Sequence, residues 1–187
     1  MGAIARLTVA EYDQMLRAGV FDQGRRVELI EGEIREMTPI GPEHETAVDQ
    51  LARWSFRNAD DGSILIRIQQ SLDLRSAESV PQPDVAWVRN GNYFSARPTA
   101  ADVLLLVEVA RTSLAYDLGE KADLYAAAGI CDYWVVDCES RRVVVHREPR
   151  PSGYGDVKSF SGAETIAPLS RPEASFMPSL AFRPTGT

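Results

Sequence analysis

The sequence predicts a mixed α/β sheet flanked by helices, and three observations lead to this fold class. Short apolar runs rich in valine and leucine, such as VLLLVEV at 103–109, are typical of strands buried on both faces. Segments with the periodicity of helices separate these runs along the chain. The length of 187 residues, with 44% hydrophobic and 25% charged residues, suits one globular domain over 1–187.

Residues 8–37 are expected to form a helix and a hairpin that precede the core. Thr8 and Glu11 have the spacing of a capping box, and Gly19 can end the helix, which predicts a helix over 9–18. The run RVELIEGEIR at 26–35 alternates polar and apolar residues on both sides of a glycine. This alternation predicts a hairpin.

The core is expected over about residues 43–137, in the order α-β-β-β-α-β. Pro42 suits the first turn of a helix that runs to about Asn58. The bounds of the four strands and the second helix are predicted from turn residues, prolines and apolar runs. The predicted strands are 64–68, 84–88, 103–109 and 132–137, and the predicted helix is 113–128. In the C-terminal part, 141–187, residues 141–146 are expected to pair with the preceding strand as a hairpin, followed by one strand around 156–160 and an extended tail.

Composition bears on several classes of function. The net charge of −7 argues against a general polyanion binder, because non-specific nucleic-acid affinity comes from clustered lysine and arginine. It leaves a nuclease open, since metal-binding carboxylates add negative charge of their own. The sequence has neither the apolar core of a signal peptide nor a run long enough to span a bilayer, so a cytoplasmic protein without a membrane partner is expected. Cys131 and Cys138 lie in no zinc motif and are expected to be free thiols.

Glu108 is a carboxylate near the end of a strand that is expected to be buried. An ionised glutamate there is costly unless it is paired, hydrogen-bonded or bound to a metal. Asp84 stands at the start of the preceding strand, so in an antiparallel pair the two carboxylates would reach the same edge. With the main-chain carbonyl of Val109 they predict a Mg²⁺ or Mn²⁺ site.

Lys121 falls within the apolar stripe of the predicted helix 113–128, at ~100° per residue. Its stem could simply cover apolar surface, or its ammonium could pair with Asp117 one turn earlier. Asp117 is itself expected to be solvated or paired along the helix. Beside two carboxylates, however, an ammonium can stabilise negative charge that develops on a phosphate.

Four segments resemble the Uma-two family of restriction-endonuclease-like proteins: ELIEGEI, GPEH, PDVAWV and VEVARTSLAYDLGEKADLYAAAGICDYWVVD. The resemblance spans roughly residues 8–182 and implies a PD-(D/E)XK nuclease fold. In that fold the Asp of the PD pair and an acid on the next strand bind metal, and a lysine assists the attacking water. Asp84 and Glu108 match the two acids. Ala110 stands where the lysine is usual, so the resemblance implies that Lys121 takes this role.

The resemblance also implies residues that complete the site. Glu28 in ELIEGE matches the family pattern as a supporting catalytic residue, and Gln69 and His44 match positions expected to bind substrate. His44 could equally be a capping or surface residue. Arg111 departs from related sequences, which often read EVADTS or EVLSPS where this chain reads EVARTS. Arg111 could contact a substrate phosphate or compete with the cation, and both roles stay open.

These residues predict a divalent-metal-dependent endonuclease that hydrolyses DNA phosphodiester bonds, with Asp84 and Glu108 as the ligands of Mg²⁺ or Mn²⁺. The alternative is a catalytically degenerate module of the same fold that binds DNA or a protein partner, because fold does not imply function. A homodimer is expected for the nuclease, since duplex cleavage cuts two strands, although the sequence points to no interface.

Overall fold

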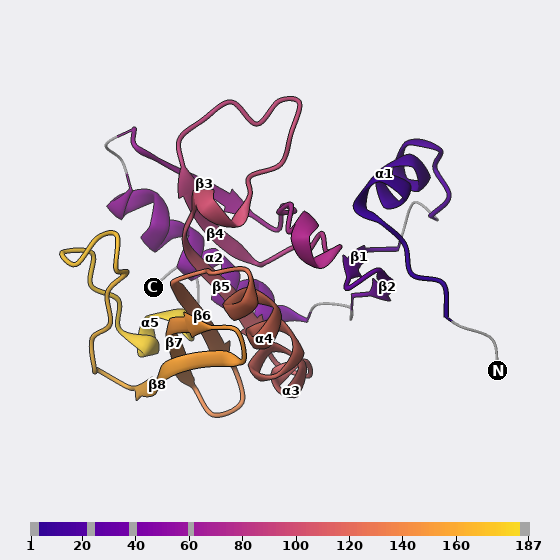
Figure 1. Cartoon of the computed structure of the whole chain (residues 1–187). Coiled ribbons are helices and arrows are strands. Elements are labelled where there is room, and N and C mark those ends of the chain that lie inside the picture. The colour runs from indigo at the N-terminus through magenta and orange to yellow at the C-terminus, as the bar shows by residue number, and fades with distance from the viewer. Residues whose placement is uncertain (1–3, 22–24, 38–40, 60–61, 184–187) are drawn as a thin grey trace.

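The central sheet of the protein has six strands in the order β3-β4-β5-β6-β7-β8, as Figure 1 shows. The computed structural model describes residues 4–21, 25–37, 41–59 and 62–183. The strands are β3 (Ile64–Ile68), β4 (Val85–Arg89), β5 (Val103–Ala110), β6 (Asp132–Asp137), β7 (Arg142–Arg150) and β8 (Gly153–Ser161). Neighbouring strands are antiparallel except β5 and β6, which are parallel and joined by a helical crossover. The sheet is therefore mixed.

Helices cover both faces of this sheet. Helix α2 (Pro42–Asn58) and the short α5 (Pro178–Ala181) pack on one face, and α3 (Leu114–Leu118) and α4 (Glu120–Ala127) pack on the other. Each interface holds its own buried apolar cluster, so alternate residues of the central strands point to opposite helices. Helix α2 begins with a proline in its first turn, as expected, and turns its apolar stripe toward the sheet.

The N-terminal part lies to one side of the main sheet (Figure 1). Helix α1 (Val9–Arg17) carries the expected capping box, and β1 (Val27–Ile30) pairs with β2 (Glu33–Glu36) in a separate two-stranded sheet. The segment after β3, which includes the 3-10 turn η1 (Arg75–Ala77), holds this unit in place. Val80 bridges to Leu29, and the Glu78 carboxylate accepts a 2.6 Å hydrogen bond from the Val9 amide. The hairpin is thereby fixed against the core.

The expected α-β-β-β-α-β order is confirmed, but the prediction of one helix over 113–128 is wrong. The helix is interrupted at Gly119, whose φ of −109° and ψ of −99° are not helical, so the segment forms two helices, α3 and α4. The backbone passes closely here, because a Cβ added to Gly119 would lie 2.9 Å from the Ala115 carbonyl oxygen. A glycine is therefore required at the break.

The C-terminal strands are longer than expected. Strands β7 and β8 have nine residues each and extend the main sheet as a hairpin, where the sequence predicted short segments at 141–146 and 156–160. A further 3-10 turn, η2 (Ala100–Asp102), leads into β5. Cys131 and Cys138 are free thiols, as expected. Within the described part of the chain, no helix combines the length and the apolar character needed to cross a membrane.

Candidate active site

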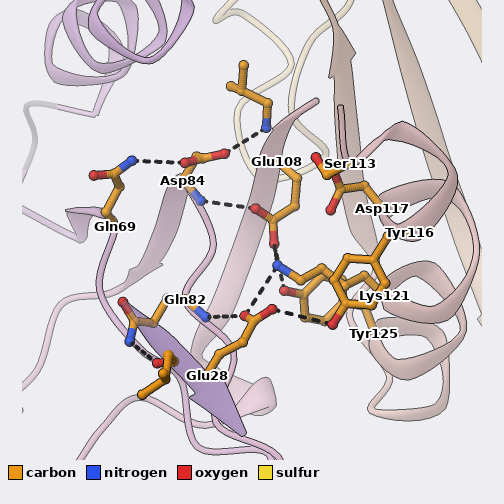
Figure 2. A network of polar contacts seen from close by, with 12 residues as sticks. Glu28, Gln69, Gln82, Asp84, Glu108, Ser113, Tyr116, Asp117, Lys121 and Tyr125 are labelled. Atoms are coloured by element: carbon orange, nitrogen blue, oxygen red, sulfur yellow. Dashed lines mark hydrogen bonds and ion pairs between the residues drawn. The ribbon is translucent and has the colours of Figure 1, made fainter. Parts of the chain in front are cut away.

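The two predicted metal ligands are brought together by the pairing of β4 with β5. The strands are antiparallel, as expected, and their register sets Val85 opposite Val107, so Asp84 comes next to Glu108. Both side chains belong to the sheet face covered by α3 and α4. The Asp84 amide donates a 3.3 Å hydrogen bond to Glu108 Oε2, and the two side chains are 5% and 3% exposed. Figure 2 shows this pair at the centre of a polar network.

Asp84 is held by donors from three directions. Its Oδ1 accepts a 3.1 Å hydrogen bond from Gln69 Nε2, and its Oδ2 accepts one of 2.8 Å from the Val109 amide. His44 Nε2, at the start of α2, lies 3.1 Å from Oδ2. Burial acts to raise the pKa of Asp84, but its contacts with His44, Val109 and Gln69 outweigh burial and hold the pKa below its ordinary value. Asp84 is therefore an oriented carboxylate.

Glu108 is bound on its other oxygen by two buried side chains of α4. Lys121 Nζ and the Tyr125 hydroxyl both donate to Oε1, each at 2.9 Å. Burial raises the pKa of Glu108 to about 8, because the Lys121 ammonium offsets it only in part and nearby carboxylates add to it. Glu108 is thus a buried acid whose neutral form is favoured mainly by burial.

Lys121 points inward, as its place in the apolar stripe predicts. Its side chain is 4% exposed, and Nζ lies 3.3 Å from Glu28 Oε2 as well as in contact with Glu108. Burial alone would lower the pKa of Lys121, but the surrounding carboxylates raise it above its ordinary value, so the ammonium stays charged. Among the ion pairs of the described residues, those of Lys121 are with Glu108 and Glu28, and not with Asp117.

Glu28 reaches the site from β1, far from the other residues in sequence. Its Oε2 accepts a 3.2 Å hydrogen bond from the Gln82 amide, and its Oε1 accepts one of 3.4 Å from the Tyr116 hydroxyl. Figure 2 shows Glu28 on the far side of Lys121 from Glu108, so the ammonium lies between two carboxylates. The N-terminal hairpin is in this way part of the site.

Asp117 is buried, which decides between the two alternatives for its side chain. It is 3% exposed, so it is not the solvated charge that was one of two alternatives. It accepts a 2.6 Å hydrogen bond from the Ser113 hydroxyl four residues earlier, which fits the other alternative, a pair along the helix. Burial raises its pKa. The solvated alternative was wrong because it assumed a continuous helix, and the break at Gly119 changes the phase between Asp117 and Lys121.

Tyr125 lies in the core, as expected. Its hydroxyl also contacts Glu108, a contact that was not predicted from the sequence. The one signal for this contact in the sequence is that Tyr125 follows Lys121 by four residues and so lies on the same side of a helix.

These side chains line a pocket of about 800 Å³. The hairpin, the start of α2 and the segment after β5 form its walls. Among the predicted site residues, the pocket is lined by Glu28, His44, Asp84, Glu108, Arg111 and Lys121. Gln69 contacts Asp84 but is not part of this lining. Arg111 lies at the rim, where its half-exposed guanidinium pairs with Glu43.

The donor set fits a hard divalent cation held by two carboxylates. Mg²⁺ takes one or two carboxylates and completes its coordination with water and substrate phosphate. Asp84 and Glu108 supply such a pair. Burial is the main cause of the raised pKa of Glu108, and a cation beside it would favour the ionised form. In the part of the chain that the structure describes, no three His, Cys, Asp or Glu side chains are grouped to hold a metal by themselves.

Gly119→Ala is expected to disturb the site through the backbone. The added methyl would meet the Ala115 carbonyl oxygen, so the α3–α4 break must shift, and α4 carries Lys121 and Tyr125. We expect the free energy of unfolding, measured by chemical denaturation, to fall by about 1–3 kcal/mol. Gly91→Ala is the control, because the nearest atoms to a methyl there belong to the movable Tyr93 ring, at 3.3 Å. Equal stability of the two variants would contradict the prediction.

Comparisons with known proteins bear on the family and the fold of this chain. A family model described as "Uma2: Putative restriction endonuclease" matches residues 9–178. The fold is similar to a crystal structure from Anabaena variabilis described as a "putative nuclease", with a TM-score of 0.73 and 13% sequence identity, over 94% of this chain and 97% of that chain. No curated protein matches the chain. At this identity the structural likeness shows the fold alone, a mixed sheet flanked by helices.

Proposed function

The chain belongs to the Uma2 (Uma-two) family of restriction-endonuclease-like proteins, and from this premise we propose that it is a divalent-metal-dependent endonuclease that hydrolyses DNA phosphodiester bonds. The observation that carries the proposal is the convergence of Asp84, Glu108 and Lys121 in one pocket. These side chains come from two strands and a crossover helix, and each is almost completely buried. Buried charges in a concave site are characteristic of functional residues.

Asp84 and Glu108 would hold the cation, Mg²⁺ or Mn²⁺. When bound, such a cation lowers the pKa of water and offsets charge on the phosphate. In hydrolysis a water oxygen bonds to phosphorus, the bond from phosphorus to one sugar oxygen breaks, and that oxygen takes a proton. The residues of this chain serve the reaction by orienting the carboxylates that would hold the cation and by offsetting negative charge on the phosphate.

The other residues of the network support the two acids. Gln69 and His44 orient the Asp84 carboxylate. Lys121 places a positive charge beside Glu108, where it can stabilise negative charge on the reacting phosphate, and Glu28 anchors the ammonium from the opposite side. Arg111, at the rim, can contact a neighbouring phosphate once it leaves Glu43.

Metal binding and DNA cleavage measured in the same samples test the proposal. We expect wild type to bind Mn²⁺ in calorimetry and to cut DNA, and Glu108→Ala to lose both. Asp156→Ala is the matched control, because Asp156 lies on β8 and pairs with Lys158 away from the pocket. Plasmid and single-stranded DNA are both offered, so that the form of the substrate does not decide the result.

The alternative, a catalytically degenerate module of this fold, makes a different prediction for the same experiment. Wild type would then bind DNA or a protein partner without Mn²⁺-dependent cleavage, and Glu108→Ala would leave that binding unchanged. The homodimer expected for duplex cleavage also stays a prediction. Sedimentation of the wild type with and without DNA would check it.

A further inference from the structure

The shape of the pocket restricts how a nucleic acid can reach Asp84 and Glu108. Both carboxylate side chains are at most 8% exposed and lie between the β1–β2 hairpin, the start of α2 and the segment after β5. The volume of about 800 Å³ is that of a small-ligand site rather than of a long open groove. A duplex is stiff over about 150 base pairs, so it cannot bend its backbone to follow the walls of such a pocket. A single strand can.

The charges at the rim also limit the number of phosphate contacts. Glu36 and Glu43 line the pocket with side chains that are 55% and 66% exposed. The cation Arg35 is paired with Glu33 and Glu120, and Arg111 is paired with Glu43. The exposed carboxylates at this rim are matched by arginines, Glu36 by Arg25 and Glu43 by Arg111. Little net positive charge therefore remains for the long rows of phosphates of a duplex. The rim therefore suits a few phosphates and not an extended backbone.

Arg26 differs from the other cationic side chains that line the pocket, because those are paired with carboxylates. It lies just before β1, is partly exposed and lines the pocket, and within the described ranges no ion pair involves its guanidinium. Lys121, Arg35 and Arg111 are all engaged by carboxylates. Arg26 can thus bind a phosphate without first giving up a carboxylate partner.

We propose that the site takes a single strand of DNA, engaged through a few phosphates, with Arg26 as the phosphate-binding residue that the family resemblance does not assign. This inference rests on the proposed function, because it names the substrate of the same pocket. One strand enters the pocket that Arg26 and Arg111 line, and its phosphate reaches the two acids. A duplex must open before it can be cut.

Binding measured without cleavage tests the inference directly. A short fluorescein-labelled DNA strand, the same strand in a duplex and its RNA counterpart are titrated with wild-type protein in EDTA, and anisotropy is followed over a range of salt concentrations. We expect the DNA strand to bind most tightly, with a slope of log K against log salt of about −2, since each phosphate on a single strand contributes about −0.7. Tighter binding of the duplex or the RNA, a slope steeper than about −4, or no binding of the DNA strand at low salt overturns the inference.

Arg26→Ala tests the assigned contact. We expect weaker binding of the single strand and a salt slope that is shallower by about 0.7, as one phosphate contact is lost. Arg57→Ala is the control, because Arg57 is exposed in the last turn of α2, about 20 Å along the helix from His44. If Arg26→Ala binds like Arg57→Ala, the role of Arg26 is overturned.

Cleavage with Mn²⁺ separates this inference from the proposed function. If the single strand binds as expected but is not cut, the nuclease proposal fails and the inference about the bound strand stands. If an intact duplex is cut faster than the single strand, the inference fails and the nuclease proposal stands.

Discussion

Lys121→Met is expected to abolish cleavage and to lower the free energy of unfolding by about 3 kcal/mol at alkaline pH, where Glu108 is ionised. Removing one partner of a buried ion pair leaves uncompensated buried charge, which typically destabilises a protein by about 3–5 kcal/mol. Lys121 is 4% exposed and is the cation between Glu108 and Glu28. Methionine has a similar length, so the change removes charge with little change in volume.

The loss should grow with pH. In the folded protein the pKa of Glu108 is about 8, against an ordinary value of 4.5. A group whose pKa is raised on folding contributes stability below its unfolded pKa, and that contribution is lost as pH rises through the folded pKa. The Lys121 ammonium lowers the pKa of Glu108. In Lys121→Met the folded-state pKa of Glu108 is therefore higher, and the fall in stability with rising pH continues to a higher pH than in wild type. The variant should therefore lie nearest to wild type in acid and farthest from it in alkali.

Urea denaturation of Lys121→Met and wild type at several pH values measures this effect. Lys158→Met is the matched control, because Lys158 is an exposed lysine paired with Asp156, and exposed pairs contribute only about 0–1 kcal/mol. Mn²⁺ should restore part of the stability of Lys121→Met, since a cation held by Asp84 and Glu108 would replace the missing charge. A variant as stable as wild type at alkaline pH would show that Lys121 does not neutralise this cluster.

Trp87→Ala is expected to lower the free energy of unfolding by about 3–5 kcal/mol, the usual range for a large aromatic side chain removed from a core. Trp87 is fully buried on β4, the strand that Asp84 precedes, and its ring stacks on Trp54 with centroids 5.1 Å apart. Its indole N–H donates a 2.8 Å hydrogen bond to the Ser55 hydroxyl. Alanine would leave a cavity and a buried hydroxyl without this partner.

Two further variants separate these contributions by chemical denaturation. Trp87→Phe keeps most of the apolar volume and loses the N–H, so we expect an intermediate loss of about 1–3 kcal/mol. Phe94→Ala removes a ring that is 98% exposed and should change stability by less than about 0.5 kcal/mol. If Trp87→Ala unfolded at the same denaturant concentration as Phe94→Ala, the stacked cluster would not contribute to stability.

The elements of the sheet could be predicted because their signals are local. The capping box at Thr8, the proline that opens α2 and the apolar run of β5 each depend on residues close in sequence. The break at Gly119 could not be predicted in this way. A glycine within a helical pattern is usually tolerated, and here the close approach of Ala115 decides the conformation.

The charged residues of the candidate site could be proposed from the sequence, but most of the contacts between them and their neighbours could not. Buried acids on adjacent strands and a lysine in an apolar stripe are visible in the sequence. The partners of Asp84 are not, since Gln69 and His44 contact the carboxylate only after β3 and α2 are placed. The burial of Asp117 could not be predicted for the same reason, because it depends on the helix break.

The aromatic residues are divided between the two faces of the sheet, and this division gives the protein two separate optical reporters. All three tryptophans of the chain, Trp54, Trp87 and Trp134, stack in the cluster beneath α2. Tyr125, Tyr133 and Tyr154 gather on the opposite face, beneath α3 and α4. Tryptophan emission therefore reports on the α2 layer alone, whereas tyrosine absorbance includes the layer that carries Lys121. A spectral change on adding a cation that appears in the tyrosine signal and not in the tryptophan emission would locate the event on one side of the sheet, without any label.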